Sequence, residues 1–345
     1  MEHPQSEPAA TPLAAAPTAT TMQAIVQDTY GDADQLRLDQ IPAPAVGPDD
    51  VLIDVRAAGV HIGDWHVMTG QPYLMRIIGF GLRSPKARVR GMDVAGTVTA
   101  LGANVTGFHV GDEVYGTCDG AFAEYATARV ETLAAKPASL TFVQAAAIPT
   151  SACTALQALR DAGRIAAGQR VLIIGASGGV GLFAVQIAKT FGAEVTGVCS
   201  GAKADVVRSV GADHVIDYTE TDITTGAQRY DLVLDMGGGR TLSQLRRCLT
   251  PHGTLVLVGG EGGGRLIGGA MVRSLRAVAL SPFVKQSLRM VLGTTTSKDL
   301  QALTSLIDSG QINPVIDRTY PLSEAADAIR HLHTGRPQGK LVITV

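Results

Sequence analysis

The sequence predicts an α/β protein with two unlike domains: a β barrel of short strands, and a doubly wound parallel sheet with helices on both faces. Residues 22 to about 130 contain strand-sized apolar runs interrupted by Gly, Pro and Asp, a texture typical of compact β structure. From Thr141 onward, wholly apolar runs of strand length alternate with stretches of helical spacing. Strands that are apolar throughout are buried on both sides, which indicates a parallel sheet.

The first predicted domain is built from short strands over residues 23–26, 51–55, 94–101 and 110–115. The end of the chain has the same texture, with a predicted helix over 323–332 and a strand over 341–345. We expect this last strand to return to the first domain, which then comprises residues 22–140 and 311–345.

The second predicted domain covers residues 141–310. It begins with an apolar strand over 171–174, a glycine-rich loop, and a helix whose apolar residues recur at helical spacing up to Gly192. Further strands are predicted over 194–198, 214–216, 232–234 and 254–258, with a helix over 204–210. This alternation is typical of strand–helix–strand units.

Composition limits the functions to consider. The chain has 345 residues, enough for two domains with hydrophobic cores. Its 31 acidic and 29 basic side chains give a net charge of −2, so we expect no nucleic-acid partner, which would need a strong positive field. With 46% hydrophobic residues, the chain is not disordered. No apolar run approaches the ~20 residues of a membrane span, so we expect a soluble protein.

The N-terminal segment and the cysteines bear on the cellular compartment. Residues 1–21 are rich in Ala, Pro and Thr and contain no Lys or Arg, unlike secretory and organelle-targeting segments. We therefore expect a disordered extension. The cysteines form no C-x-x-C pair, so the sequence predicts reduced thiols and a cytoplasmic protein. They are Cys118, Cys153, Cys199 and Cys248.

The glycine-rich loop predicts a dinucleotide site. It directly follows an apolar strand and opens an amphipathic helix, the context in which a G-x-G-x-x-G pattern binds a pyrophosphate. Gly175 turns the chain off the strand, Gly178 and Gly179 let the phosphates approach the backbone, and Gly181 allows close helix packing. Unpaired N–H groups at the helix start favour the negative charge. The predicted cofactor residues here are Gly175, Ser177, Gly178, Gly179, Val180 and Gly181.

The end of the next strand bears on the choice of coenzyme. An acidic residue there would bind the ribose 2′-hydroxyl and select NAD. The sequence has no acid between Val198 and Asp205, but it has Ser200 and Lys203, which could receive a 2′-phosphate. We therefore predict NADP(H), the alternative for Lys203 being a solvated side chain at the start of a helix.

Six motifs in the segment from Met22 to Val345 resemble those of the medium-chain dehydrogenase/reductase superfamily, in its zinc-independent quinone oxidoreductase-like branch. They are AGVHIGD at 58–64, GMDVAG at 91–96, VGDEV at 110–114, GAFAEY at 120–125, the glycine loop, and GADHVIDY at 211–218. The resemblance implies a GroES-like barrel domain, a Rossmann domain that binds NADP(H), a cleft between them, and a homodimer.

The resemblance also bears on zinc. The zinc-dependent cousins place ligands where this chain has His61, Met92 and a residue near Thr150, and their four-cysteine lobe is missing. Methionine is a poor zinc ligand, so we predict no metal. Without a Lewis acid, hydride transfer to a conjugated acceptor needs less assistance than oxidation of a simple alcohol. The sequence therefore predicts an NADPH-dependent reductase of quinones or other α,β-unsaturated carbonyls.

Candidate catalytic residues follow the first motif. The side chains that could donate a hydrogen bond or a proton to the substrate are His61, Asp64, His66 and Tyr73. The related quinone reductases have an Asn where this chain has His61 and a Tyr where it has His66. The resemblance also implies a mainly structural role for Asp64. It also implies coenzyme contacts from Thr154, Tyr218 and Gly259. Both histidines could instead only brace the barrel.

Two other functions stay open at this point. One is a zinc-free alcohol, aldehyde or enoyl-thioester reductase, and the other is a non-catalytic NADPH-binding sensor or scaffold.

Two segments are basic and lack acids. Residues 76–90 hold five basic side chains, and residues 265–298 hold six. We expect the first to cap the substrate and the second to form an amphipathic lid or a dimer segment. Contact of the second segment with anionic lipid is the alternative.

Overall fold

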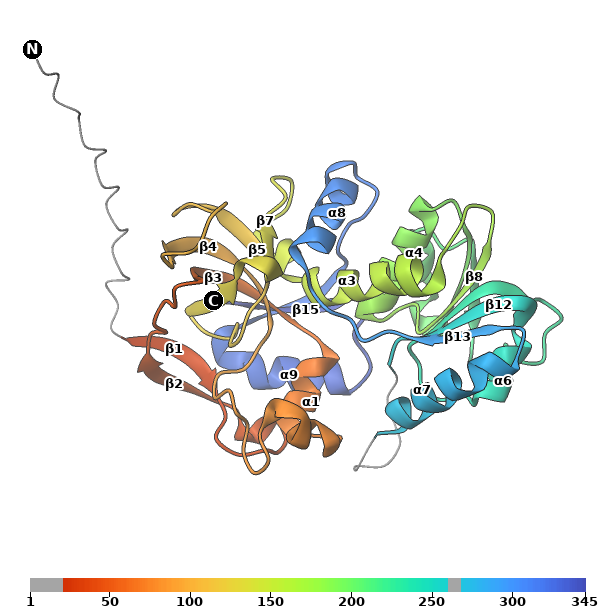
Figure 1. The fold of residues 1–345 in the computed structure, drawn as a ribbon, viewed down its shortest axis with the longest axis horizontal. Helices are drawn as coiled ribbons and strands as arrows, with labels where there is room; N and C mark the ends of the chain where they lie inside the picture. The colour runs from red at the N-terminus through yellow and green to blue at the C-terminus, as the bar shows by residue number, and fades with distance from the viewer. Residues whose placement is uncertain (1–20, 260–267) are drawn as a thin grey trace, which may run out of the picture.

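The computed structural model describes residues 21–259 and 268–345. Together these residues fold into two β-rich lobes (Figure 1). The extension predicted over residues 1–21 lies almost wholly outside the described residues. Its last residue, Thr21, belongs instead to a strand and faces Pro42 in an antiparallel hairpin. The hairpin consists of β1 (Thr21–Val26) and β2 (Arg37–Pro42).

The first lobe is a seven-stranded, mostly antiparallel sheet in the order β14-β15-β3-β4-β5-β7, with β6 paired to β3. The last strand of the chain pairs with β3, with Leu341 opposite Val60, which confirms that it returns to this lobe. The strands are β3 (Asp50–Val60), β4 (Asp93–Leu101), β5 (Glu113–Thr117), β6 (Tyr125–Arg129), β7 (Leu133–Ala135), β14 (Ile316–Pro321) and β15 (Lys340–Thr344). Two helices flank the sheet, α1 (Ile62–Thr69) and α9 (Ala325–His333).

The second lobe is a six-stranded parallel sheet in the order β10-β9-β8-β11-β12-β13. From β8 the strands are added in one direction as far as β10, and from β11 they are added on the other side of β8. This change of direction confirms the doubly wound arrangement. The strands are β8 (Arg170–Ile174), β9 (Glu194–Cys199), β10 (His214–Asp217), β11 (Tyr230–Asp235), β12 (Leu249–Leu257) and β13 (Ser287–Met290). The helices include α4 (Gly179–Thr190), α5 (Ala204–Ser209), α6 (Leu242–Arg247) and α7 (Gly269–Leu280).

The two lobes share one hydrophobic core. Ala57 and Ala95 from the first sheet belong to the same buried cluster as Ile173 from the second. Between the lobes lie α2 (Phe142–Ala146), α3 (Pro149–Gln157), a π-helical turn η4 (Ala158–Gly163) and α8 (Ser297–Asp308). The Tyr115 hydroxyl of β5 donates to the Leu300 carbonyl of α8 over 2.8 Å. This shared core holds the carboxyl edge of the parallel sheet against the first lobe.

Some predicted element boundaries were wrong for identifiable reasons. β5 begins at Glu113 rather than at residue 110, because Asp112 accepts a hydrogen bond from the His109 N–H and closes a turn there. The helix predicted from residue 323 begins as a 3₁₀ turn and becomes α9 only at Ala325. Within the described residues, no helix combines the length and the apolar character needed to cross a membrane.

Candidate functional site

The glycine-rich loop lies where β8 meets α4. Gly175 leaves the strand with φ of +88°, which a side chain would strain. A Cβ on Gly181 would overlap the Gly175 carbonyl oxygen and Ala176, so only glycine fits at this packing point. Gly178 is the N-cap residue of α4 and has no side chain to cap it, which leaves the first N–H groups of the helix turned toward a ligand.

The other residues predicted on this loop pack beneath it, against the protein interior. Ser177 is buried, and Val180 packs against the shared core. Gly179 begins α4, and a Cβ there would lie 3.0 Å from the side chain of Lys340 and 3.3 Å from the Ser151 hydroxyl. The loop fits a dinucleotide pyrophosphate, because its glycines add no side chains and the start of α4 has no side-chain cap.

The residues predicted to select the coenzyme lie together at the ends of β9 and β10. Ser200 precedes the 3₁₀ turn η5 (Gly201–Lys203), and the Tyr218 N–H donates to the Cys199 carbonyl, which joins the two strand ends. Tyr218 has an exposed side chain. This edge therefore carries a hydroxyl, a phenol and an ammonium group within one short stretch of surface.

Lys203 is not a freely solvated side chain. Its Nζ donates to the carbonyls of Gly335 and Pro337, over 2.8 and 2.9 Å, and burial lowers its pKa. These contacts bring the exposed Arg336 to the same edge. Sequence reasoning missed Arg336, because it lies in a different lobe and no local motif marks it.

Asp217 is an acid that the sequence interpretation did not include at this edge. It ends β10, and a Cβ on Gly201 would overlap its carboxylate. Hydrogen bonds from the hydroxyl and the N–H of Thr219 hold the pKa of Asp217 below its usual range. A charged carboxylate therefore lies beside the groups predicted to receive a 2′-phosphate.

The remaining predicted coenzyme residues lie at the other end of the parallel sheet's edge. Thr154 is buried on α3, its hydroxyl donates to the Thr150 carbonyl, and a Cβ on Gly293 would overlap it. Gly259 follows β12, and its carbonyl accepts from Arg273 on α7 over 3.0 Å. Thr154 thus lies against Gly293 in the segment that follows β13, and Gly259 follows the neighbouring strand β12.

His61 and Asp64 form a capping box at the start of α1. The Asp64 carboxylate accepts from the His61 N–H over 2.9 Å, and His61 Nδ1 accepts from the Gly63 N–H over 3.0 Å. Burial raises the pKa of Asp64, against the opposing effect of His61. Asp64 therefore has a structural role in this arrangement.

The other ring nitrogen of His61 has no hydrogen-bond partner among the described residues. His61 is only 8% exposed, and Nε2 lies 3.8 Å from Asp64 Oδ2, too far for a hydrogen bond. Because Nδ1 is an acceptor, the neutral ring carries its proton on Nε2. Within the described part of the chain, this is a buried donor with nothing to donate to.

His66 and Tyr73 lie further along the surface formed by α1 and the loop after it, called the first-lobe wall. His66 Nδ1 contacts the Gln71 carbonyl over 3.0 Å at the end of α1. Arg76 lies 4.6 Å from the centre of the Tyr73 ring and 4.2 Å from that of Tyr30. The clamp formed by these two rings and the guanidinium fixes the loop after α1.

At the positions where the zinc-dependent relatives have metal ligands, this chain has side chains that bind metals poorly or that already form hydrogen bonds. Met92 is partly exposed, and the Thr150 hydroxyl donates to Asp93 over 2.5 Å. The Asp93 carboxylate is fully buried, with Lys340 Nζ 3.5 Å from its other oxygen and 3.1 Å from the Ser151 hydroxyl. No group of three or more His, Cys, Asp or Glu side chains in residues 21–259 and 268–345 could hold a metal ion. This donor set does not fit zinc.

The first basic segment is largely used for structure. Besides Arg76 in its aromatic clamp, Arg88 pairs with Asp28 over 2.7 Å and with Asp39 over 3.3 Å, and Arg90 is buried. Only Arg83 and Lys86 lie exposed without such contacts among the described residues.

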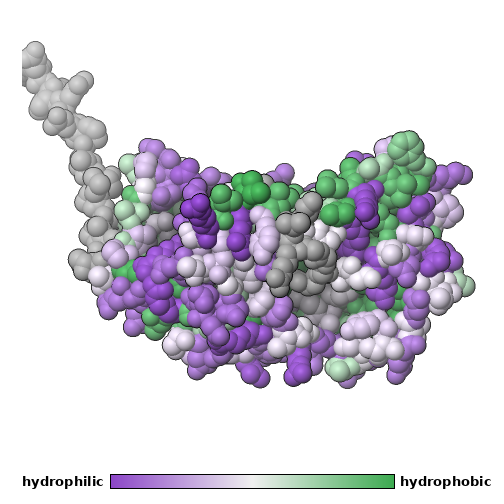
Figure 2. Space-filling view, turned by 90° about the horizontal axis from the view of Figure 1, so that it is seen from below, coloured by the Kyte–Doolittle hydropathy of each residue, from purple (hydrophilic) through white to green (hydrophobic). Residues whose placement is uncertain are grey.

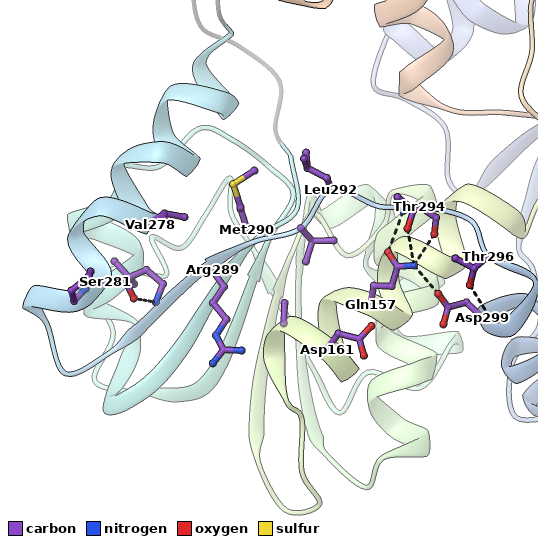
Figure 3. A pocket seen from close by; sticks show the side chains of 14 residues that line it. Gln157, Asp161, Val278, Ser281, Arg289, Met290, Leu292, Thr294, Thr296 and Asp299 are labelled. Carbon is purple, nitrogen blue, oxygen red and sulfur yellow. Dashed lines mark hydrogen bonds between the residues drawn. The ribbon is translucent and has the colours of Figure 1, made fainter. Parts of the chain in front are cut away.

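The second basic segment is not one amphipathic helix. It is divided between α7, a 3₁₀ turn and β13, and its first member, Arg265, lies outside the described residues. Two cavities border this segment. One, of about 920 Å³, lies along β13 and away from the glycine loop, with Gln157, Thr294 and Asp299 hydrogen-bonded at one end (Figure 3). The other, of about 770 Å³, lies between α7 and the loop that precedes α6.

Comparison with known proteins gives matches across the chain. A family described as "Alcohol dehydrogenase GroES-like domain" matches residues 47–138, and one described as "Zinc-binding dehydrogenase" matches residues 210–343. The mouse protein named "NAD(P)H oxidoreductase RTN4IP1, mitochondrial" is 33% identical over 94% of this chain and 90% of its own. The Arabidopsis thaliana protein named "NADPH-dependent alkenal/one oxidoreductase, chloroplastic" is 33% identical over 93% of this chain and 79% of its own.

A solved structure is similar to this chain over nearly its whole length. The quinone oxidoreductase from Coxiella burnetii superposes with a TM-score of 0.83 at 30% identity, covering 94% of this chain and 99% of that one. The similarity thus spans both lobes, including the glycine loop and the wall that carries His61. The chain belongs to the medium-chain dehydrogenase/reductase superfamily, in the branch of quinone oxidoreductases and alkenal reductases, and is an NAD(P)H-dependent oxidoreductase with a GroES-like and a Rossmann-type domain.

Proposed function

We propose that this enzyme uses NADPH to reduce quinones or other α,β-unsaturated carbonyl compounds, without zinc. The observation that carries the proposal is the buried Nε2–H of His61, which has no hydrogen-bond partner in residues 21–259 and 268–345. A buried unpaired donor costs free energy, and a substrate oxygen at this wall would satisfy it.

The chemistry divides between the bound coenzyme and the chain. NADPH supplies the hydride. The glycine loop and the start of α4 bind its phosphates, and the walls of the cleft orient the acceptor. In the proposed mechanism, His61 donates from Nε2 to the oxygen on which negative charge develops. Because conjugation spreads that charge over a quinone or enone, a hydrogen-bond donor suffices where a simple alcohol would need a Lewis acid.

The relatives support this substrate class. One is named a quinone oxidoreductase and another an alkenal/one oxidoreductase, and both names describe conjugated carbonyl acceptors. We propose His61 as the donor, His66 and Tyr73 as further groups on the substrate wall, and Asp64 as the residue that positions His61 through the capping box.

The test compares two substitutions that both preserve the N-cap. In His61→Asn the side-chain oxygen can keep the cap and the amide still offers an N–H beyond it, although closer to the backbone than Nε2. In His61→Ser the hydroxyl can keep the cap, but the side chain is too short to replace the ring N–H. We expect His61→Ser to lower kcat with 1,2-naphthoquinone about 100-fold and to leave the Kd for NADPH within about twofold. His61→Asn should retain most of the activity. Equal turnover by His61→Ser and the wild type would remove His61 from the mechanism.

For the coenzyme we propose NADPH over NADH. Ser200, Lys203, Tyr218 and Arg336 support a 2′-phosphate, while Asp217 opposes it. Titration of both coenzymes under the same conditions tests this preference, and at least tenfold tighter binding of NADH would overturn it.

The zinc-free reaction has its own test. We expect metal analysis of the purified enzyme to find well below one zinc per chain, and activity to survive prolonged treatment with a chelator. One equivalent of zinc whose removal abolishes turnover would overturn this part of the proposal.

We also propose that the enzyme is a homodimer. β13 pairs only with β12 among the described strands, and its other side borders the cavity of Figure 3, where Val278 and Leu292 are exposed. An open strand edge with apolar neighbours favours pairing with a second copy. Sedimentation analysis of the wild type and of Leu292→Asp tests this, and a wild-type monomer would exclude it.

For localisation we propose the cytoplasm, the compartment that four free, buried cysteines favour, although relatives are named mitochondrial and chloroplastic. Figure 2 shows a largely polar face with separate apolar patches, so we expect membrane contact to be weak. Imaging of the full chain with a C-terminal tag tests the compartment, and an organelle signal would overturn the proposal.

A further inference from the structure

The turn that follows α9 connects the two lobes at the edge predicted to bind the adenosine end of the coenzyme. Lys203, from the second lobe, donates from Nζ to the carbonyls of Gly335 and Pro337 over 2.8 and 2.9 Å. Gly335 follows the helix with φ of +66°, and its N–H donates to the Leu332 carbonyl over 3.1 Å. A short, hydrogen-bonded segment therefore links Lys203 to the last turn of α9.

The last residue of α9 stacks on α1. The ring centroids of His333 and Trp65 lie 3.7 Å apart, with an angle of 9° between the two planes. α1 and α9 pack side by side in the first lobe (Figure 1). Parallel rings in contact resist separation, because separation loses contact area. The stack therefore fixes the end of α9 against the middle of α1.

Trp65 lies between the residues of α1 that the proposed function uses. Asp64, which holds His61 in the capping box, precedes it, and His66 follows it. α1 is a single helix of eight residues, about two turns, so we expect it to move as one body. A shift of Trp65 would therefore also shift the proposed donor on the first-lobe wall.

Lys203 gives this series of contacts two possible arrangements. An ammonium group has three hydrogen-bond donors, and Lys203 directs two of them at the turn. A 2′-phosphate at this edge would take the third donor or displace one of the two carbonyls, and either event changes how Lys203 holds the turn. Coupling between two sites requires an element of this kind, with two discrete arrangements.

We propose that His333 is a positioning residue, which transmits the binding of a 2′-phosphate at Lys203 to the first-lobe wall through its stack on Trp65. The inference rests on the proposed function and adds to it a dependence of the acceptor side on the identity of the coenzyme. With a 2′-phosphate at this edge, Lys203 and the turn hold His333 in the arrangement that best places His61. Without one, as with NADH, this arrangement is less populated.

The first test needs no turnover. Trp65 is the only tryptophan of the chain, so tryptophan emission reports directly on the stack. The probes are adenosine 2′,5′-bisphosphate and 5′-AMP, which differ in the 2′-phosphate and lack the nicotinamide that would reach the first-lobe wall. We expect the bisphosphate at saturation to change the emission of the wild type and 5′-AMP to leave it nearly unchanged. In Lys203→Met neither compound should change it.

The outcomes of this test separate the inference from the proposed function. If the bisphosphate displaces NADPH but leaves the emission unchanged, the inference is wrong and the proposed function stands. An emission change that persists in Lys203→Met also contradicts the inference. If the bisphosphate does not compete with NADPH, the proposed 2′-phosphate site is wrong, and the inference falls with it.

Kinetics give a second readout with a matched control. His333 is exposed, so we expect His333→Ala to keep the fold. It should lower kcat with 1,2-naphthoquinone about fivefold at saturating NADPH and leave the Kd for NADPH within about twofold. His333→Phe keeps a ring on Trp65 and should restore most of the turnover. The control is His331→Ala, on the same helix, where the ring contacts the Tyr320 hydroxyl over 2.8 Å. It should turn over like the wild type.

A double-mutant cycle distinguishes transmission from two separate defects. If Lys203 and His333 act in one series, Lys203→Met/His333→Ala should lose no more kcat than the worse single variant, about fivefold, whereas independent effects would multiply to about 25-fold. Multiplied effects would exclude the inference, as would equal losses in His333→Phe and His333→Ala. The His61→Ser variant tests the proposed donor separately.

Discussion

The two surfaces that would form the proposed site are built on different physical bases. The surface predicted to bind the coenzyme, called the coenzyme wall, lies at the carboxyl edge of the parallel sheet and presents mainly backbone: a loop with four glycines and the uncapped start of α4. The opposite wall, from the first lobe, presents side chains such as His61 and His66, which are held by a capping box and by the loop after α1.

The difference has a practical consequence. Atoms added to a backbone surface obstruct a ligand even where the fold accepts them, whereas a side-chain surface depends on the packing behind it. Between the two walls lies a buried charge pair, Asp93 and Lys340, and the Lys340 side chain also lies beside Gly179 at the start of α4. We therefore expect substitution of this pair to act mainly on stability, and substitution of Gly178 in the loop to act on coenzyme binding.

The largest effect should come from Lys340→Met. This change leaves the fully buried Asp93 carboxylate without its cation, and breaking a buried pair costs about 3–5 kcal/mol. Urea denaturation measures the free energy of unfolding, with Lys298→Met, an exposed lysine, as the control. A loss below about 1 kcal/mol would mean that Asp93 is satisfied by Thr150 alone, and the contrast between the walls would weaken.

The next effect should come from Gly178→Ala. A Cβ at Gly178 meets only the Gly175 carbonyl oxygen, at 3.4 Å, so the fold should be unchanged while the methyl group obstructs the pyrophosphate. We expect the Kd for NADPH to rise about 10- to 100-fold, measured by fluorescence titration. Gly226→Ala, where a Cβ would meet nothing within 4 Å, is the control. Unchanged affinity would place the phosphates elsewhere.

A smaller effect is expected from Asp217→Asn, which tests the adenosine end of the coenzyme wall. Asparagine keeps an acceptor for Thr219 but removes the negative charge beside Lys203. We expect the preference for NADPH over NADH to increase about two- to fivefold at low salt and less at high salt. Asp205→Asn, an exposed acid paired with Arg208, should change nothing. A preference that stays constant would show that Asp217 does not face the 2′ position.

The smallest effect is the pH dependence that Asp64 gives to stability. Burial raises the pKa of Asp64, so its contribution to stability is fully present below the carboxyl pKa of the unfolded chain and is lost as the pH rises through the folded value. Asp64→Asn keeps the cap on the His61 N–H and removes this titration. We therefore expect the free energy of unfolding to fall less between pH 4 and pH 7 in the variant. Identical slopes for the two proteins would contradict this.

The place of the glycine loop between a strand and a helix could be predicted from the sequence because its information is local. A strand, a loop with four glycines and a helix lie within about 20 consecutive residues, and their geometry follows from the backbone. The domain boundaries at residues 140 and 310 remain predictions, since α2, α3 and α8 pack between the lobes and share their core.

The parts that could not be predicted depend on contacts across long separations. Lys203 reaches the carbonyls of Gly335 and Pro337 over 132 and 134 residues, and Lys340 reaches Asp93 over 247. No spacing rule connects such residues. The unpaired Nε2 of His61 was also hidden, because it follows from an N-cap in which a histidine takes the place usually held by Ser, Thr, Asp or Asn.

The return of the last strand also sets the order in which the molecule can be completed during synthesis. Strands β8 to β13 are contiguous in sequence and can pair as soon as they leave the ribosome. The first lobe is made earlier but cannot be completed earlier. Until residues 340–344 emerge, the end of β3 has one open side and Asp93 has no counter-charge. The part of the protein that is synthesised first therefore has to wait for the part that is synthesised last.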